Sequence, residues 1–130
     1  MSFLGDLKTY WAANSTLNSA LPSTSVFVGY VPARSTFPYA VVTTIGQPSD
    51  WTTGKSYLGT MGFQVSIYHT SLASAESIAA TVVNQLAFSN PVSGSWVEPG
   101  NYVVFKDPDA PQDVYHSAWD FRIRENKQLP

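Results

Sequence analysis

Residues 61–88 change their hydrophobic periodicity within one continuous stretch, and this change limits the possible folds more than any other feature of the chain. From Met61 to Tyr68 the apolar residues alternate with small or polar ones, which predicts a half-buried β-strand. From Leu72 onward the apolar residues recur every three or four positions, which predicts an α-helix. The predicted core positions of this helix are Leu72, Ala75, Ala79, Val82 and Leu86. A strand that leads directly into a helix predicts a helix packed on a sheet.

The joint between the two elements, VSIYHTS at 65–71, places His69 beside two hydroxyl side chains. Ser71 is a good helix N-cap, and SNP at 89–91 ends the helix, so capping accounts for the hydroxyls. A hydrolytic triad needs a nucleophile on a sharp turn and an oxyanion hole, and the sequence has no such elbow. We therefore expect His69 to bond to the backbone at a strand end, although a small hydrolase stays open as a distant alternative.

The remaining elements complete an α+β pattern. Apolar residues from Phe3 to Trp11 recur at helical spacing, with Ser2 as a possible cap, and predict a short N-terminal helix that ends within 14–19. Strands are predicted at 24–31, 37–45, 101–105 and 114–124, with Pro38 at a strand entry and loops at 46–56 and 89–100. In the last strand Trp119, Phe121 and Ile123 should face the core, opposite Asp120, Arg122 and Arg124.

The expected fold is a single domain over 1–130. It would contain a mixed, mainly antiparallel sheet of about five strands, with the N-terminal helix and a second helix at about 71–88 packed on it.

Charged residues are unusually scarce in the chain. They make up 12% of its 130 residues, against about a quarter in ordinary soluble domains. Between Thr9 and Val97 the charged residues are Arg34, Asp50, Lys55 and Glu76. Interface centres are depleted of charge, so we expect part of the surface to lie against other chains; a neutral, hydroxyl-rich surface is the alternative. Helix 71–88 carries one charge, Glu76, and its other faces include Ile78 and Val83, which predicts contacts on more than one side.

Several chemistries receive little support. The chain has no cysteine and two histidines, His69 and His116, so a zinc site would need carboxylates from distant loops. The acidic loop with Asp107, Asp109 and Asp113 lacks the glycine and the bidentate glutamate of a calcium loop. A net charge of −2 does not favour a nucleic-acid-coating surface. We expect no catalytic residues, no metal and no cofactor.

The N-terminus has no basic stretch followed by an apolar core, and no apolar run approaches the length of a membrane span. The expectation is a soluble intracellular product with no membrane partner. Trp51 and Trp96, in the two predicted loops, could stack on sugars or anchor a protein interface. Charge depletion favours protein partners, and a carbohydrate- or ligand-binding module stays open.

The order of elements resembles the tail-completion or tail-terminator proteins of long-tailed bacteriophages. The likeness covers nearly the whole chain, and it is clearest at Phe37-Pro38-Tyr39 before a β-branched strand and where VSIYHTS enters the helix near Glu76. The chain departs from the family pattern in its Trp-containing segment at 46–56 and its acidic, proline-rich segment at 107–113. These departures leave open which joint of the particle it occupies.

The resemblance implies a non-enzymatic virion protein of the tail or neck, made in the host cytoplasm. It implies a ring of about six copies that ends the tail tube and meets the head connector, and a head-completion or stopper protein is the alternative. DNA would pass through without specific binding, repelled by Asp107, Asp109 and Asp113 facing the lumen. The expected partners are other copies of the chain, the tail tube protein and the head-tail connector protein. The candidate interface residues are Trp51, Lys55, Glu76, Val83, Trp96, Arg122 and Arg124.

Overall fold

The computed structural model describes the backbone of residues 3–29, 36–46, 49–51, 56–89, 95–106 and 113–128, and the side chains of 6–29, 36–44, 62–89, 96–106 and 113–124. The helices are α1 (Phe3–Ala13), α2 (Ser15–Ala20) and α3 (Leu72–Leu86), with a 3-10 turn η1 (Ser23–Ser25). The strands are β1 (Val26–Val28), β2 (Tyr39–Gly46), β3 (Ser49–Trp51), β4 (Ser56–His69), β5 (Ser95–Lys106) and β6 (Tyr115–Gln128).

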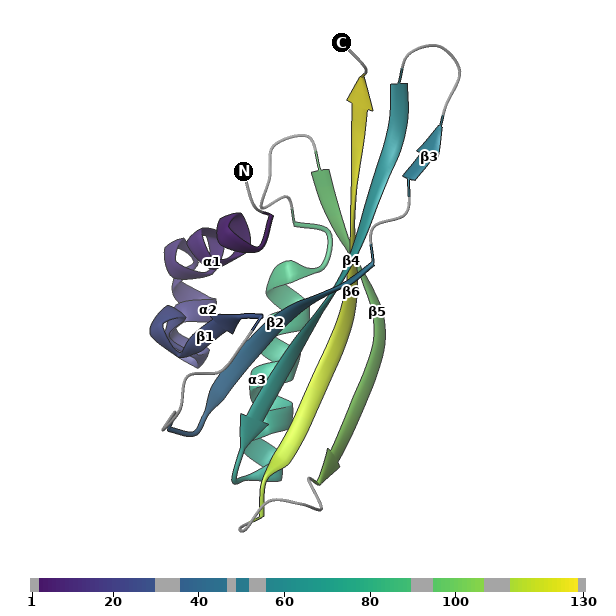
Figure 1. Cartoon of the computed structure of the whole chain (residues 1–130). Helices are drawn as coiled ribbons and strands as arrows, with labels where there is room; N and C mark the ends of the chain where they lie inside the picture. The colour runs from purple at the N-terminus through teal and green to yellow at the C-terminus, as the bar shows by residue number, and fades with distance from the viewer. Residues whose placement is uncertain are drawn as a thin grey trace.

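The strands form one mixed sheet in the order β1-β2-β4-β6-β5, and β3 pairs with the early part of β4. The β1–β2 pair is parallel and the other pairs are antiparallel. The predicted α+β class and mainly antiparallel sheet are confirmed. Figure 1 shows that β3, the start of β4 and the end of β6 extend beyond the helices.

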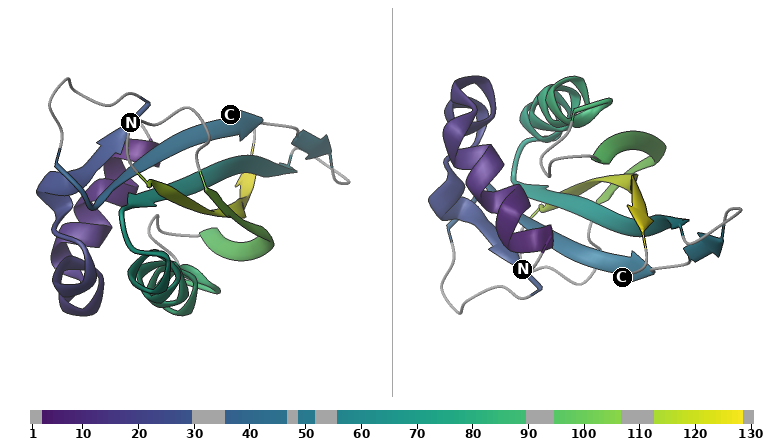
Figure 2. Two further views of the ribbon diagram at one scale, coloured as in Figure 1. Left: turned by 90° about the horizontal axis from the view of Figure 1, so that it is seen from below. Right: turned by 90° about the horizontal axis from the view of Figure 1, so that it is seen from above.

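The helices cover one face of the sheet, and the hydrophobic core lies between them and that face. Both views of Figure 2 place α1 and α3 on the same side of the strands. Phe63, Val65 and Ile67 of β4 are buried, as the alternation predicts, and Phe121 of β6 stacks on Phe63 with ring centroids 5.2 Å apart. The helices contribute Leu7, Trp11, Leu17, Ala79, Val82 and Leu86 to the same cluster.

Helix α3 begins as predicted, because the Ser71 hydroxyl accepts a hydrogen bond from the backbone N–H of Ser74. Ala75, Ile78, Ala79, Val82 and Leu86 are buried. Two assignments were wrong: Leu72 is 41% exposed, since it lies in the first turn, and Ile78 faces the core because it follows Ala75 by three residues. Val83 is partly buried and packs against the core.

The N-terminal region forms two helices, whereas one was predicted. Asn14 follows α1, and its side-chain oxygen accepts hydrogen bonds from the N–H groups of Thr16 and Leu17, so it caps a second short helix. The buried Trp11 indole donates to the Leu21 carbonyl at 2.8 Å and fixes the end of α2 against α1. Asn14 also donates to the Gln85 side chain at 3.2 Å, which joins this pair to α3.

Both predicted loops contain strand residues, so these two predictions were partly wrong. Within 46–56, β3 pairs with β4, and β4 already begins at Ser56. Within 89–100, β5 begins at Ser95 and places Val97 in the core. Trp51 and Trp96 therefore lie in strands. Glycine, serine and proline obscured the strand pattern, and the pairing that decides it comes from residues 57–59 for β3 and from β6 for β5.

Replacing Phe121 by alanine should lower the free energy of unfolding by about 3–5 kcal/mol, because the ring is buried and a cavity would remain. The matched control is Phe105→Ala, whose side chain is 48% exposed and which should lose less than half as much. Urea unfolding at one fixed protein concentration measures both. Equal losses for the two variants would show that the core is not centred on the β4–β6 face.

Candidate assembly interface

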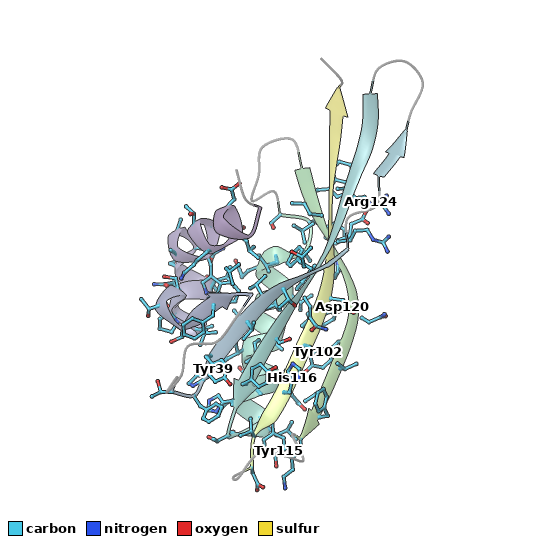
Figure 3. The ribbon with its side chains drawn as sticks, viewed as in Figure 1. Tyr39, Tyr102, Tyr115, His116, Asp120 and Arg124 are labelled. Carbon is cyan, nitrogen blue, oxygen red and sulfur yellow. The ribbon has the colours of Figure 1, made fainter. Side chains whose placement is uncertain are left out.

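The face of the sheet opposite the helices carries an aromatic row that crosses five strands. Its members are Phe27 on β1, Tyr39 on β2, Tyr68 on β4, His116 on β6 and Phe105 on β5. Successive ring centroids lie 6.2, 5.1, 4.4 and 4.7 Å apart in that order. Strand register produces the row, because Tyr39 pairs with Tyr68, Tyr68 with His116, and His116 with Phe105. Figure 3 labels Tyr39 and His116 in this part of the sheet.

A polar network lies further along the same face. Gln64 of β4 pairs in register with Asp120 of β6, and its amide donates to Asp120 Oδ1 at 2.9 Å. The Ser66 hydroxyl donates to Gln64 Oε1 at 3.1 Å. Both acceptors are satisfied within the sheet, so this network orients the Gln64 and Asp120 side chains.

An ion-pair cluster follows, made of Trp96, Glu98, Arg122 and Arg124. Arg124 Nε donates to Glu98 Oε1 at 2.8 Å, and the Trp96 indole donates to Glu98 Oε2 at 3.2 Å. The hydrogen bond from Trp96 and then that from Arg124 lower the pKa of Glu98, and the charges of Arg124 and Arg122 add to the effect while burial opposes it. Arg122, which pairs in register with Glu98, is exposed.

A hollow of about 290 Å³ lies between the polar network and the ion-pair cluster. Its lining includes Glu98, Asp120 and Arg122 together with Gly100 and Asn101. The register of β5 shifts between Pro99 and Tyr102, which forms a bulge at this point. A Cβ on Gly100 would lie 3.0 Å from the Asp120 carbonyl oxygen, so glycine permits β5 to approach β6 here.

Comparison with known proteins identifies the family. The sequence of residues 7–126 matches the family described as tail completion protein gp17. The chain belongs to this family. The resemblance found in the sequence is therefore confirmed, and the protein is a structural component of a phage-like tail and of its virion. The family is one of structural proteins, which favours a protein without catalytic activity.

Two solved structures are similar in fold to this chain. A chain in the structure titled "Virion of native gene transfer agent (GTA) particle" superposes with a TM-score of 0.72 at 19% identity, covering 97% of this chain and 100% of that one. A second solved chain gives a TM-score of 0.51 at 16% identity, covering 98% of this chain and 92% of that one. At these identities the likeness concerns the fold. No curated protein matches the sequence.

The tail completion fold brings three of the predicted interface residues together: Trp96, Arg122 and Arg124 meet around Glu98. Sequence reasoning missed Glu98, although its alternation with the buried Val97 marks the two residues as lying on opposite faces. Glu76 lies on the exposed side of α3, away from this cluster. Lys55, like the side chain of Trp51, lies outside the described part of the structure.

The predicted acidic group is described only at Asp113. Its carboxylate pairs with the Lys106 ammonium at 2.7 Å, and this pairing raises the pKa of Lys106. Asp107 and Asp109 lie outside the described residues.

At the connection between β4 and α3, the Ser71 N–H donates to His69 Nδ1 at 3.3 Å. This is the bond to the backbone that the sequence predicted for this histidine.

Over the described ranges, histidine, aspartate and glutamate side chains form no group of three that could hold a metal ion. Among the helices described here, none is both long and apolar enough to cross a membrane.

The ion-pair cluster predicts a pH-dependent contribution from Glu98. Because the pKa of Glu98 is lowered in the folded protein, its carboxylate stabilises the fold above the unfolded-state value of about 4.3, and this contribution is lost as the pH falls through the lowered value. Glu98→Gln should cost about 0.5 kcal/mol at neutral pH, since the pair is partly exposed and screened. The difference from wild type should shrink as the pH falls below about 4.3 and vanish once Glu98 is protonated in the folded protein. Thermal unfolding of both proteins across a range of pH measures this stability difference, and Glu76→Gln is the control. A loss of stability in Glu98→Gln that did not depend on pH would contradict the stabilising role of the Glu98 carboxylate.

Proposed function

We propose that the protein forms a ring, of about six copies, at the head-proximal end of the tail tube. There it stops polymerisation of the tube and joins the tail to the head connector. The observation that carries this proposal is a sheet that the described helices cover on one face only, inside a fold of the tail completion family. Its open face presents the aromatic row and the ion-pair cluster to a partner.

A ring of identical subunits needs two different surfaces on each copy, because its contacts are heterologous. The open sheet face is one region available to a neighbour. The outer side of α3 is another, and its exposed residues are small or polar apart from Leu72. They include Ala73, Glu76, Ser77, Ala80 and Asn84. The scarcity of charge in the chain supports the use of such surfaces in contacts.

A ring ends a tube when one of its faces binds the last tube layer and the other face does not recruit another tube subunit. The second face is then available to the head connector. The lumen between them must pass DNA without retaining it, and carboxylates repel phosphate groups. We place Asp107, Asp109 and Asp113 on the lumen for this reason, with Asp113 partly neutralised by Lys106.

Particles that lack the protein should have tails of abnormal length that do not attach to heads. The reason is that an uncapped tube continues to accept subunits and presents no surface for the connector. Electron microscopy of a knockout lysate measures the tail lengths, and addition of the purified protein should restore joined particles. Tails of normal length on filled heads would reject the proposed function.

Replacing Asp107, Asp109 and Asp113 together by lysine should slow DNA ejection, because the lumen would then attract phosphates. The rate of DNA release from purified particles is the measurement. A control for added positive charge replaces Ser15, Thr16 and Ser19, exposed residues of α2, by lysine, which changes the net charge by half as much. An ejection rate unchanged in the aspartate variant would remove these residues from the lumen.

A further inference from the structure

The last part of β5 is an open sheet edge with apolar side chains on both faces. Val103 is 51% exposed, Val104 is 37% exposed and Phe105 is 48% exposed. One edge of this segment pairs with β6, and in the described part of the chain no strand pairs with the other. A row of backbone N–H and C=O groups is thus open to a further strand.

Proteins usually protect such an edge with charge, proline or a bulge. In β5 these devices lie at the two ends of the segment. Pro99 and the bulge precede it, and Lys106 is the final residue of the strand. The residues between them, 102–105, are Tyr-Val-Val-Phe and carry no charge. A partner strand is the element that satisfies both the open backbone groups and the apolar side chains.

The opposite edge of the same sheet has matching properties. It is formed by β1, whose sequence Val-Phe-Val is also uncharged, and Phe27 and Val28 are partly exposed. Within the described residues, β1 pairs with β2 on one side only. Figure 1 shows β1 and β5 at opposite edges of the sheet.

We propose that the β5 edge of one copy pairs with the β1 edge of the next, so that the sheets of neighbouring subunits join. This inference rests on the proposed ring and names the surface that closes it. A β5–β5 contact would be two-fold and would give a dimer, whereas a β5–β1 contact is heterologous and can close a ring.

Strand directions agree with this pairing. β1 is parallel to β2, and β2 is antiparallel to β4. β4 is antiparallel to β6, which is antiparallel to β5, so β5 runs opposite to β1. Rotation about a ring axis along the strands preserves these directions. β5 and the β1 of the next copy therefore meet antiparallel, which is slightly the more stable arrangement.

The aromatic row gives a second, independent reason to expect that β5 pairs with β1 of the next copy. It begins at one edge of the sheet with Phe27 and ends at the other with Phe105. Joining β5 to β1 of the next copy brings these two rings next to each other across the boundary. The row then continues from subunit to subunit, and the two edge rings lose their exposure to water.

Disulfide cross-linking tests the pairing, and the absence of cysteine in the chain gives a clean background. Three variants combine Val28→Cys with Val104→Cys, Val28→Cys with Lys106→Cys, and Phe27→Cys with Val103→Cys. In each pair the two side chains lie on one face of the sheet, and the three pairs sample registers that differ by two residues. After mild oxidation of purified tails, at least one variant should give covalent dimers and higher multimers on denaturing gels. Each single-cysteine variant should give no multimer beyond dimer, and a control with Val28→Cys and Ser19→Cys should give no ladder.

The outcomes separate the pairing from the proposed function. Tails that carry a ring but yield no cross-link in any register would overturn the β5–β1 contact and leave the ring intact. Tails with no ring of this protein at their ends would overturn both.

A charge substitution provides a second readout. Val103→Lys should keep the melting temperature of the monomer, because the side chain is exposed, and should abolish assembly at the tail end. Ser19→Lys, an equal charge on the exposed side of α2, should assemble normally. Normal assembly of Val103→Lys would count against the pairing.

Discussion

The antiparallel pairing of β4 with β6 is the interaction on which the rest of the structure depends. Both strands are 14 residues long, and they pair continuously from Ser56–Gln128 to His69–Tyr115. Because side chains alternate across a strand, this one register sends Phe63 and Phe121 to the helices and Gln64 and Asp120 to the open face. A slip of one residue in either strand would turn polar side chains into the core. The core and the candidate interface are therefore set by the same hydrogen-bond ladder.

Local periodicity explains the elements that could be predicted from the sequence. The alternation at 61–68, the Ser71 cap and the spacing of Ala75, Ala79, Val82 and Leu86 are properties of neighbouring residues, and the structure confirms them where it describes them. The second N-terminal helix, β3 and the early start of β5 could not be found in this way. The start of β5 depends on the pairing of Ser95 with Glu125, which lie far apart in the chain. The α2 cap at Asn14 and the pairing of β3 with residues 57–59 are local, but neither segment has a clear apolar period that marks it as a separate element.

The composition of the chain predicted that an interface exists, but it did not predict how the residues of the candidate interface are arranged. Scarce charge predicted that part of the surface lies against other chains, and Trp96, Arg122 and Arg124 were named individually as candidates. The sequence does not state the register between β5 and β6, so it could not show that Glu98 joins them. The aromatic row was missed for the same reason, since Tyr68 and His116 lie 48 positions apart and become neighbours only through β4–β6 pairing.

If the apolar edge of β5 pairs with β1 as proposed, it must do so without causing uncontrolled association. In this protein the open segment of β5 is short, the bulge and Pro99 bound one end, and Lys106 bounds the other. The proposed partner, β1, has three residues, so a single contact between two copies would make few hydrogen bonds and hold weakly. A closed ring makes every contact intramolecular with respect to the others, which raises the effective concentration of each edge. Weak edges that become stable only on closure would let subunits stay apart in solution and lock together on the end of a tail tube.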